Sequence, residues 1–312
     1  MSTIKYEIKK TALAGKRNNN TIRLYLRAID RFWRWAKAKG IRSLDQVPDV
    51  PALIEEYVAY LVTQGYTAST IHSYVAPITY GLGLSMQESR AVRKPRRVAA
   101  ENIRGRGAQH KDAQRPEFGR LLAFQSVVGI RRAELARLTT GCLVRDESGY
   151  LCVHVRRGKG GKEQLQRILP GDEELVQATF NSSAGIRVFT VSEMQNKIDL
   201  HKLRAEQARR AYDYYLHRIQ TEPDYPDQLV EELSARYMHL HRKASLSGLD
   251  QFLAQLTTPT GKTTWDVKGA SKQRAMELGR PTSYDRLALL AVSVFHLSHW
   301  RLDVTVSNYM IA

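Results

Sequence analysis

The chain has 312 residues, of which 43% are hydrophobic and 25% are charged, a balance that suits globular domains and excludes a disordered basic tail. Its 48 Lys and Arg residues outnumber 31 Asp and Glu residues, and the formal net charge of +17 predicts a polyanionic partner, nucleic acid first. No run of about 18 apolar residues predicts a membrane span, so we expect no membrane partner. Cys142 and Cys152 have neither disulfide nor zinc-site spacing, and we expect no metal and a reducing, cytoplasmic compartment.

The first 86 residues predict a small helical bundle. Pro51 suits the first turn of a helix, Gly40 suits the end of one, and Thr21 is a candidate cap. Short connections favour direct packing between neighbouring helices. Apolar residues at helical spacing predict helices over residues 20–40, 51–65 and 67–83.

Residues 87–115 form a predicted basic linker, in which charged residues gather among proline and glycine with few large apolar groups. A charged run is usually a solvated segment, but this one joins two folded regions of a basic protein. We therefore expect it to lie along a phosphate backbone. Its candidate DNA-binding residues are Arg90, Arg93, Lys94, Arg96, Arg97, Arg104 and Arg106.

Residues 116–312 predict a second domain, mainly α with a small antiparallel β-sheet. The β-forming segments Tyr150–Val155 and Gln164–Leu169 flank a glycine-rich basic turn, which predicts a hairpin. A further short strand is predicted at Ile186–Val191. Helices are predicted over residues 118–128, 131–138, 201–219 and 287–294.

Arginine and histidine recur at positions suited to holding a phosphate. Arg131 opens a predicted helix, and Glu134 is placed three residues later to steady its guanidinium. His201 and Arg204 share one helical face, where both side chains can meet one phosphate. Each motif alone is more often an ordinary surface feature than a site, and the order of the motifs along the chain carries the interpretation.

Lysine and tyrosine complete the candidate set. Lys159 at the hairpin tip is flanked by glycine, and its ammonium can protonate a leaving oxygen; Lys162 is its rival for this role or another DNA contact. Tyr309, ten residues after His299, supplies a phenol that can act as a nucleophile. A terminal tyrosine more often anchors the chain end, and only the combination favours chemistry.

Taken together, these residues resemble the active-site set of the tyrosine recombinases, the phage integrase family. The resemblance covers nearly the whole chain, and its most specific parts are Gly-Ile-Arg-x-x-Glu-Leu at 129–135 and His-x-Leu-Arg at 201–204. It implies a helical core-binding domain at 1–86, a linker at 87–115 and an α+β catalytic domain at 116–312. The implied catalytic residues are Arg131, Lys159, His201, Arg204, His299 and Tyr309.

The resemblance also implies a mechanism. Tyr309 would cleave double-stranded DNA through a 3′-phosphotyrosyl intermediate without a cofactor, and the two arginines would stabilise the charged phosphorus. His299 would add a hydrogen bond there, Lys159 would protonate the departing 5′-oxygen, and His201 would assist proton movement at the tyrosine. The implied assembly is a homotetramer on two duplexes, nucleoid-associated and serving a mobile genetic element.

Two departures from the family keep alternatives open. Ser298 stands where the family has glycine before the histidine, and residues of about 222–283 form an insertion, predicted as a loop or subdomain. One alternative is a type IB topoisomerase-like strand transferase, which rejoins the same strand. The other is a DNA-binding accessory protein that has lost catalysis.

Overall fold

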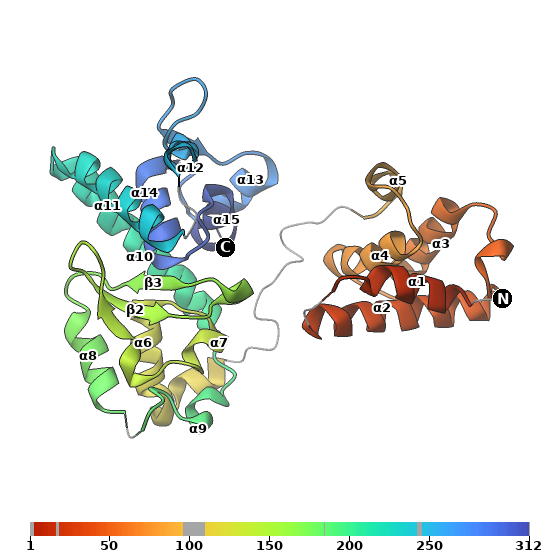
Figure 1. The fold of residues 1–312 in the computed structure, drawn as a ribbon, viewed down its shortest axis with the longest axis horizontal. Coiled ribbons are helices and arrows are strands. Elements are labelled where there is room, and N and C mark those ends of the chain that lie inside the picture. The colour runs from red at the N-terminus through yellow and green to blue at the C-terminus, as the bar shows by residue number, and fades with distance from the viewer. Residues whose placement is uncertain (1–2, 17–18, 96–109, 184, 242–244, 312) are drawn as a thin grey trace. The chain divides into compact units, whose positions relative to one another are not determined.

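The computed structural model describes residues 3–16, 19–95, 110–183, 185–241 and 245–311. The chain divides into two compact units, Met1–Arg104 and Gly105–Ala312 (Figure 1). In the described ranges, helices predominate in both units, and the strands belong to the second. The predicted fold class, mainly α with a small antiparallel sheet, is therefore confirmed at this level.

The first unit is the predicted helical bundle. Phe32 packs edge-on against Tyr57 with ring centroids 5.0 Å apart, and both side chains are fully buried. A Cβ atom at Gly81 would lie 2.5 Å from Cγ2 of Ile8, so glycine lets two helices approach closely here. The helices are α1 (Ile4–Leu13), α2 (Asn19–Ala38), α3 (Val50–Thr63), α4 (Ala68–Gly81) and α5 (Met86–Ala91).

Local signals explain most of the helix ends in this unit. Asp49 caps α3 by accepting the amide of Ala52 at 2.9 Å, and Pro51 lies in its first turn as predicted. The prediction of Thr21 as a cap is wrong, because α2 already begins at Asn19. Helix α1 was not predicted; it is short and lysine-rich, and it is held by burial against α2 and α4.

The described parts of the predicted linker include helical residues. Its first residues belong to α5, which places Arg90 in the last turn of that helix. Arg96, Arg97, Arg104 and Arg106 lie outside the described residues. Short helical turns occupy His110–Gln114 and Pro116–Phe118, before the second unit's first long helix.

The second unit contains the predicted hairpin within a three-stranded antiparallel sheet. Strand β2 (Leu151–Val155) lies between β1 (Leu143–Arg145) and β3 (Gln164–Arg167), with Val153 opposite Gln166. Strand β1 was not predicted, because three residues carry too little pattern. The strand predicted at Ile186–Val191 is wrong: that segment makes a single bridge between Arg187 and Thr139 and then enters a short helix.

Helices cover the sheet of the second unit. Helix α6 ends at Gly129, whose φ of 66° is the left-handed conformation that favours glycine. Helix α7 spans only Arg132–Leu135, shorter than predicted, whereas α10 begins one residue before and ends two residues after the predicted helix over 201–219. In Figure 1, α6 and α8 lie on one side of β2 and β3, and α11 and α14 on the other. The helices in this part are α6 (Gly119–Val128), α7 (Arg132–Leu135), α8 (Glu173–Asn181), α9 (Val191–Met194) and α10 (Leu200–Thr221).

The insertion predicted at about 222–283 is a folded part of the second unit's core. Arg236 of this segment is fully buried and donates to Asp146 at 2.5 Å and to Glu147 at 2.8 Å. Arg167 on β3 donates to Asp146 at 3.0 Å and to Glu232 at 2.5 Å. The segment contains α11 (Tyr225–Leu240), α12 (Leu246–Leu253), β4 (Thr264–Asp266) and α13 (Gly269–Glu277), and β4 pairs with β5 (Ser283–Asp285).

Two tight turns shape the final residues. After α14 (Arg286–Ala291) the chain makes a π-helical turn at 292–296, and after α15 (Leu302–Thr305) a second one at 306–310. Between them, Ser298 and Trp300 have φ of 51° and 60°. The Trp300 ring packs against His241 and Phe252 at centroid distances of 4.8 and 5.4 Å. The insertion therefore anchors the turn that carries His299.

Candidate active site

Arg131 lies where the sequence predicts, just before α7. Its backbone amide donates to Oε2 of Glu134 at 2.9 Å, and its Nη1 donates to Oε1 at 2.7 Å. The Glu134 side chain is almost fully buried, whereas 24% of the Arg131 side-chain surface stays exposed. One face of this cation therefore stays open to a ligand.

Arg204 is fully buried on the first turns of α10. Its Nη1 donates to the carbonyl of Gly129, and its Nη2 donates to the carbonyl of Leu297 at 2.9 Å. Its Nε has no hydrogen-bond partner within the described residues, although a buried donor without a partner is costly. Burial lowers the pKa of Arg204, and the nearby Arg131 lowers it further. This buried cation is suited to an anionic ligand.

His299 and Tyr309 are in direct contact. Nε2 of His299 lies 2.9 Å from Oη of Tyr309, and their rings are 5.3 Å apart between centroids. Burial lowers the pKa of His299 to about 3, with the charges of Arg204 and Arg131 acting in the same direction. The imidazole is therefore neutral near pH 7 and able to accept a proton from the phenol.

Tyr309 closes the cluster from the C-terminal turn. Its ring centroid is 5.4 Å from that of His201 and 5.7 Å from Cζ of Arg204. Arg209 donates to its backbone carbonyl at 2.7 Å, which fixes the turn against α10. Tyr309 is only 3% exposed, so its phenol is sheltered in this state.

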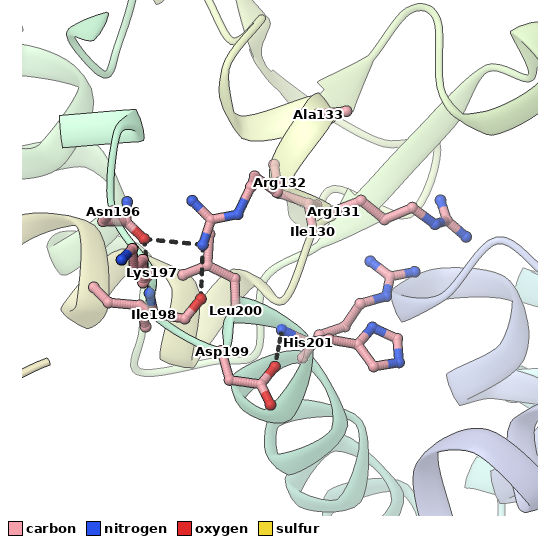
Figure 2. Close-up of a pocket in the computed structure, with 11 residues that line it drawn as sticks. Ile130, Arg131, Arg132, Ala133, Asn196, Lys197, Ile198, Asp199, Leu200 and His201 are labelled. Carbon is pink, nitrogen blue, oxygen red and sulfur yellow. Dashed lines mark hydrogen bonds between the residues drawn. The ribbon is translucent and has the colours of Figure 1, made fainter. Parts of the chain in front are cut away.

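A pocket of about 590 Å³ opens beside this cluster (Figure 2). Figure 2 shows Arg131 and His201 extending toward the same side of the pocket. Arg204 also lines it, whereas His299 and Tyr309 do not, so the pocket ends at the residues that contact the phenol. The structure thus brings five of the six predicted catalytic residues into one cluster.

Lys159, the sixth residue, lies at the tip of the β2–β3 hairpin and is exposed. Its ammonium is among the positive charges that lower the pKa of His299. Lys162 is also exposed, and its carbonyl accepts the amide of Gly158 at 2.7 Å across the hairpin turn. Both lysines thus lie at the exposed turn of the hairpin.

The predicted DNA-binding residues that the structure describes are divided between the two units. Arg90, Arg93 and Lys94 belong to the first unit and Lys162 to the second. Lys94 is half-buried: it donates to the carbonyl of Ser89 at 2.6 Å, and burial lowers its pKa. The other members of the set lie outside the described residues.

Several residues that line the pocket were not predicted from the sequence, among them Arg132 and Asn196. Arg132 reaches across the pocket and donates to Oδ1 of Asn196 at 2.9 Å and to the carbonyl of Ile198 at 2.6 Å (Figure 2). Asp199 caps α10 by accepting the amides of His201 and Lys202 at 3.1 and 3.0 Å. Only the Asp199 cap, directly before a helical pattern, left a signal in the sequence.

Neither a metal cluster nor a membrane helix is evident in the described ranges. No group of three or more His, Cys, Asp or Glu side chains is placed to hold a metal ion there. No helix there is long and apolar enough to cross a bilayer.

Comparisons with known proteins give little further information. No protein-family model matches the chain, and no curated protein matches it. Among solved structures, the chain is similar to one described as the crystal structure of XerA recombinase, with 17% identity over 81% of this chain and 97% of that one. The TM-score is 0.24, too low to carry an argument.

Proposed function

We propose that this protein is a DNA strand transferase of the tyrosine-recombinase type, with Tyr309 as its nucleophile. One observation carries the proposal: the phenol oxygen is 2.9 Å from a neutral imidazole, and its ring lies beside a fully buried guanidinium. A histidine that accepts the phenol proton and an arginine that attracts the target phosphate are what a tyrosine nucleophile requires.

In the proposed reaction, Oη of Tyr309 attacks the scissile phosphorus as its proton passes to Nε2 of His299. The bond from phosphorus to the 5′-oxygen breaks, and Lys159 gives that oxygen a proton. The products are a 3′-phosphotyrosyl link and a free 5′-hydroxyl, which later attacks the link on a partner strand in the reverse sense. Arg131 and Arg204 stabilise the charge that develops on the phosphoryl oxygens.

We assign the proton transfer to His299, whereas the resemblance implies His201. The assignment is supported by the 2.9 Å contact between Nε2 of His299 and the phenol oxygen; the His201 ring lies beside the phenol ring. Burial lowers the pKa of His299, and the surrounding cations lower it further; a bound phosphate would neutralise part of their charge and raise the pKa. Substrate binding thus turns His299 into a better proton acceptor.

The rest of the expected machinery belongs to the same proposal. The helical unit would act as the core-binding domain, and Arg90, Arg93, Lys94 and the neighbouring linker arginines would contact phosphates. The net charge of +17 of the chain favours binding to the polyanionic backbone of a DNA duplex. The working assembly would be a homotetramer on two duplexes, nucleoid-associated and serving a mobile genetic element.

A nicked suicide duplex tests the proposal. Cleavage beside the nick releases a short fragment and traps the protein on DNA, so a denaturant-resistant adduct is expected from the wild type and none from Tyr309→Phe. Exchange between two duplexes supports the recombinase, whereas an adduct with relaxation of a single supercoiled duplex and no exchange would support a type IB topoisomerase-like enzyme. DNA binding without any adduct would support the accessory protein and overturn the proposal.

A further inference from the structure

Arg204 joins two segments that are far apart in the sequence. Its guanidinium bridges the carbonyl of Gly129, at the end of α6, and the carbonyl of Leu297, after the first π-helical turn. The first segment leads directly into Arg131 and the second into His299. The spacing of the candidate catalytic groups therefore depends on how these two segments are held.

Gln166 bridges the same two segments one residue earlier. It lies on β3, is fully buried, and its Nε2 donates to the carbonyls of Val128 and His296, each at 2.6 Å. Gln164 donates to its Oε1, which leaves both hydrogens of Nε2 for the two carbonyls. Gln166 and Arg204 thus connect the same two segments at successive residues, 128 to 296 and 129 to 297.

Gln125 makes an equivalent bridge on the other side of the cluster. This α6 side chain is fully buried, and its Nε2 donates to the carbonyls of Ile130 at 2.7 Å and Leu200 at 2.8 Å. Those carbonyls belong to the residues directly before Arg131 and His201. One amide therefore fixes the separation of two groups that line the pocket.

Gln207 completes the set on α10, one turn after Arg204. Its Nε2 lies 3.0 Å from Nδ1 of His296, whose Nε2 lies 3.1 Å from Oη of Tyr215. Burial lowers the pKa of His296, so the ring is neutral and accepts the amide hydrogen. Gln207 therefore ties α10 to the turn that leads to His299.

We propose that Gln125, Gln166 and Gln207 are positioning residues, which set the distances among the catalytic groups without touching substrate. This inference rests on the proposed function. Carbonyl acceptors require a donor, and an uncharged amide supplies two hydrogens from one atom without burying a charge. A displacement of about 1 Å at such a site can cost about 100-fold in rate.

Gln125→Met and Gln166→Met remove the donors and keep the side-chain length. On the nicked suicide duplex at saturating protein, we expect the single-turnover cleavage rate to fall by about 30- to 100-fold. The dissociation constant for DNA should change by less than about threefold, because the phosphate contacts remain. Gln207→Met, which loses one hydrogen bond, gives a milder test if Gln166→Met does not fold.

Arg120→Met is the matched control on the same helix as Gln125. Arg120 also donates to two carbonyls, those of Thr179 at 3.0 Å and Val188 at 2.5 Å, but neither precedes a catalytic residue. It should lose stability and keep a cleavage rate within about threefold of wild type. An equal loss of rate in Arg120→Met and Gln125→Met would overturn the positioning role.

Gln166→Glu adds a readout that a purely structural role would not move. A carboxylate cannot donate to the two carbonyls, whereas a protonated carboxyl can donate to one. The cleavage rate of this variant relative to wild type should therefore rise as the pH falls, and a constant ratio would count against the inference.

The Nε–H resonance of Arg204, assigned by its loss in Arg204→Lys, gives a test without catalysis. The chemical shift of this resonance should change in Gln166→Met, because Gln166 and Arg204 hold the same two segments, and should stay unchanged in Arg120→Met. The opposite pattern overturns the inference. A wild type that forms no adduct would refute the proposed function instead, so the two failures can be told apart.

Discussion

Nε2 of His299 lies 2.9 Å from Oη of Tyr309, which follows it ten positions later in the chain. The left-handed conformations of Ser298 and Trp300 fold His299 back onto the C-terminal turn. This contact joins the candidate proton acceptor to the candidate nucleophile, and several consequences can be measured.

Replacing His299 should slow cleavage without releasing DNA. In His299→Phe the phenol loses its proton acceptor, and general-base catalysis typically contributes about 10²- to 10⁴-fold. We expect a loss of that order in the single-turnover rate on the suicide duplex, with DNA affinity within about threefold of wild type. If His299→Phe cleaves at the wild-type rate and His201→Phe is inactive, His201 is the proton acceptor instead.

The low pKa of His299 also predicts a pH dependence of stability. The native pKa is about 3 and the unfolded value is about 6.5, so between these limits the unfolded state binds a proton that the native state lacks. The contribution of His299 to stability is complete above about pH 6.5 and declines as the pH falls toward 3.

Urea titrations of wild type and His299→Gln measure this difference. Wild type should take up about one more proton on unfolding near pH 5 than the variant does. His296, whose pKa burial also lowers, remains in both proteins and provides a common background. Identical pH slopes would mean that the native imidazole titrates normally.

Ser298 is predicted to store backbone strain. Its φ of 51° costs a non-glycine residue about 1–3 kcal/mol, while glycine loses about 0.5–1 kcal/mol in chain entropy. Ser298→Gly should therefore raise the free energy of unfolding by about 0.5–2 kcal/mol. Ser298→Ala keeps the strained backbone and should give no such gain; a similar gain in both variants would point to the hydroxyl instead.

Through Arg236, the insertion is predicted to contribute to the stability of the second unit. Arg236→Met would leave Asp146 buried beside one arginine instead of two, and breaking a buried ion pair from one side costs about 3–5 kcal/mol. Lys262→Met, in an exposed pair with Asp266 of the same segment, should cost less than about 1 kcal/mol. Denaturant unfolding compares them, and similar small losses would show that the insertion is only appended.

Local pattern was enough to predict the parts of the fold that have strong local causes. The hairpin of β2 and β3, the helix predicted over 201–219 and the end of the helix predicted over 118–128 follow from β-forming runs, helical periodicity and the glycine at 129. Strand β1 was missed because its three residues carry too little pattern, and helix α1 because it is short and is held by packing against α2 and α4. The false strand at 186–191 has the right residue types but no partner strand beyond one bridge.

The candidate site likewise contains residues that the sequence predicts and residues that it does not. Arg131 with Glu134, and His201 with Arg204, have helical spacings that can be recognised in the sequence. The buried glutamines could not be assigned from it, because their acceptors lie up to 130 positions away. The contact between His299 and Tyr309 depends on left-handed turns at serine and tryptophan, residue types that do not predict such turns.

The residue that becomes linked to DNA tests the central claim most directly. Trypsin cleaves after Arg301 and releases residues 302–312, which contain Tyr309 as their only tyrosine. After the suicide reaction and nuclease digestion, mass spectrometry should find a 3′-nucleotide remnant on this peptide, with fragment ions that place it on Tyr309. A remnant on any other residue, or no covalent remnant under conditions where the protein binds the duplex, would contradict the account.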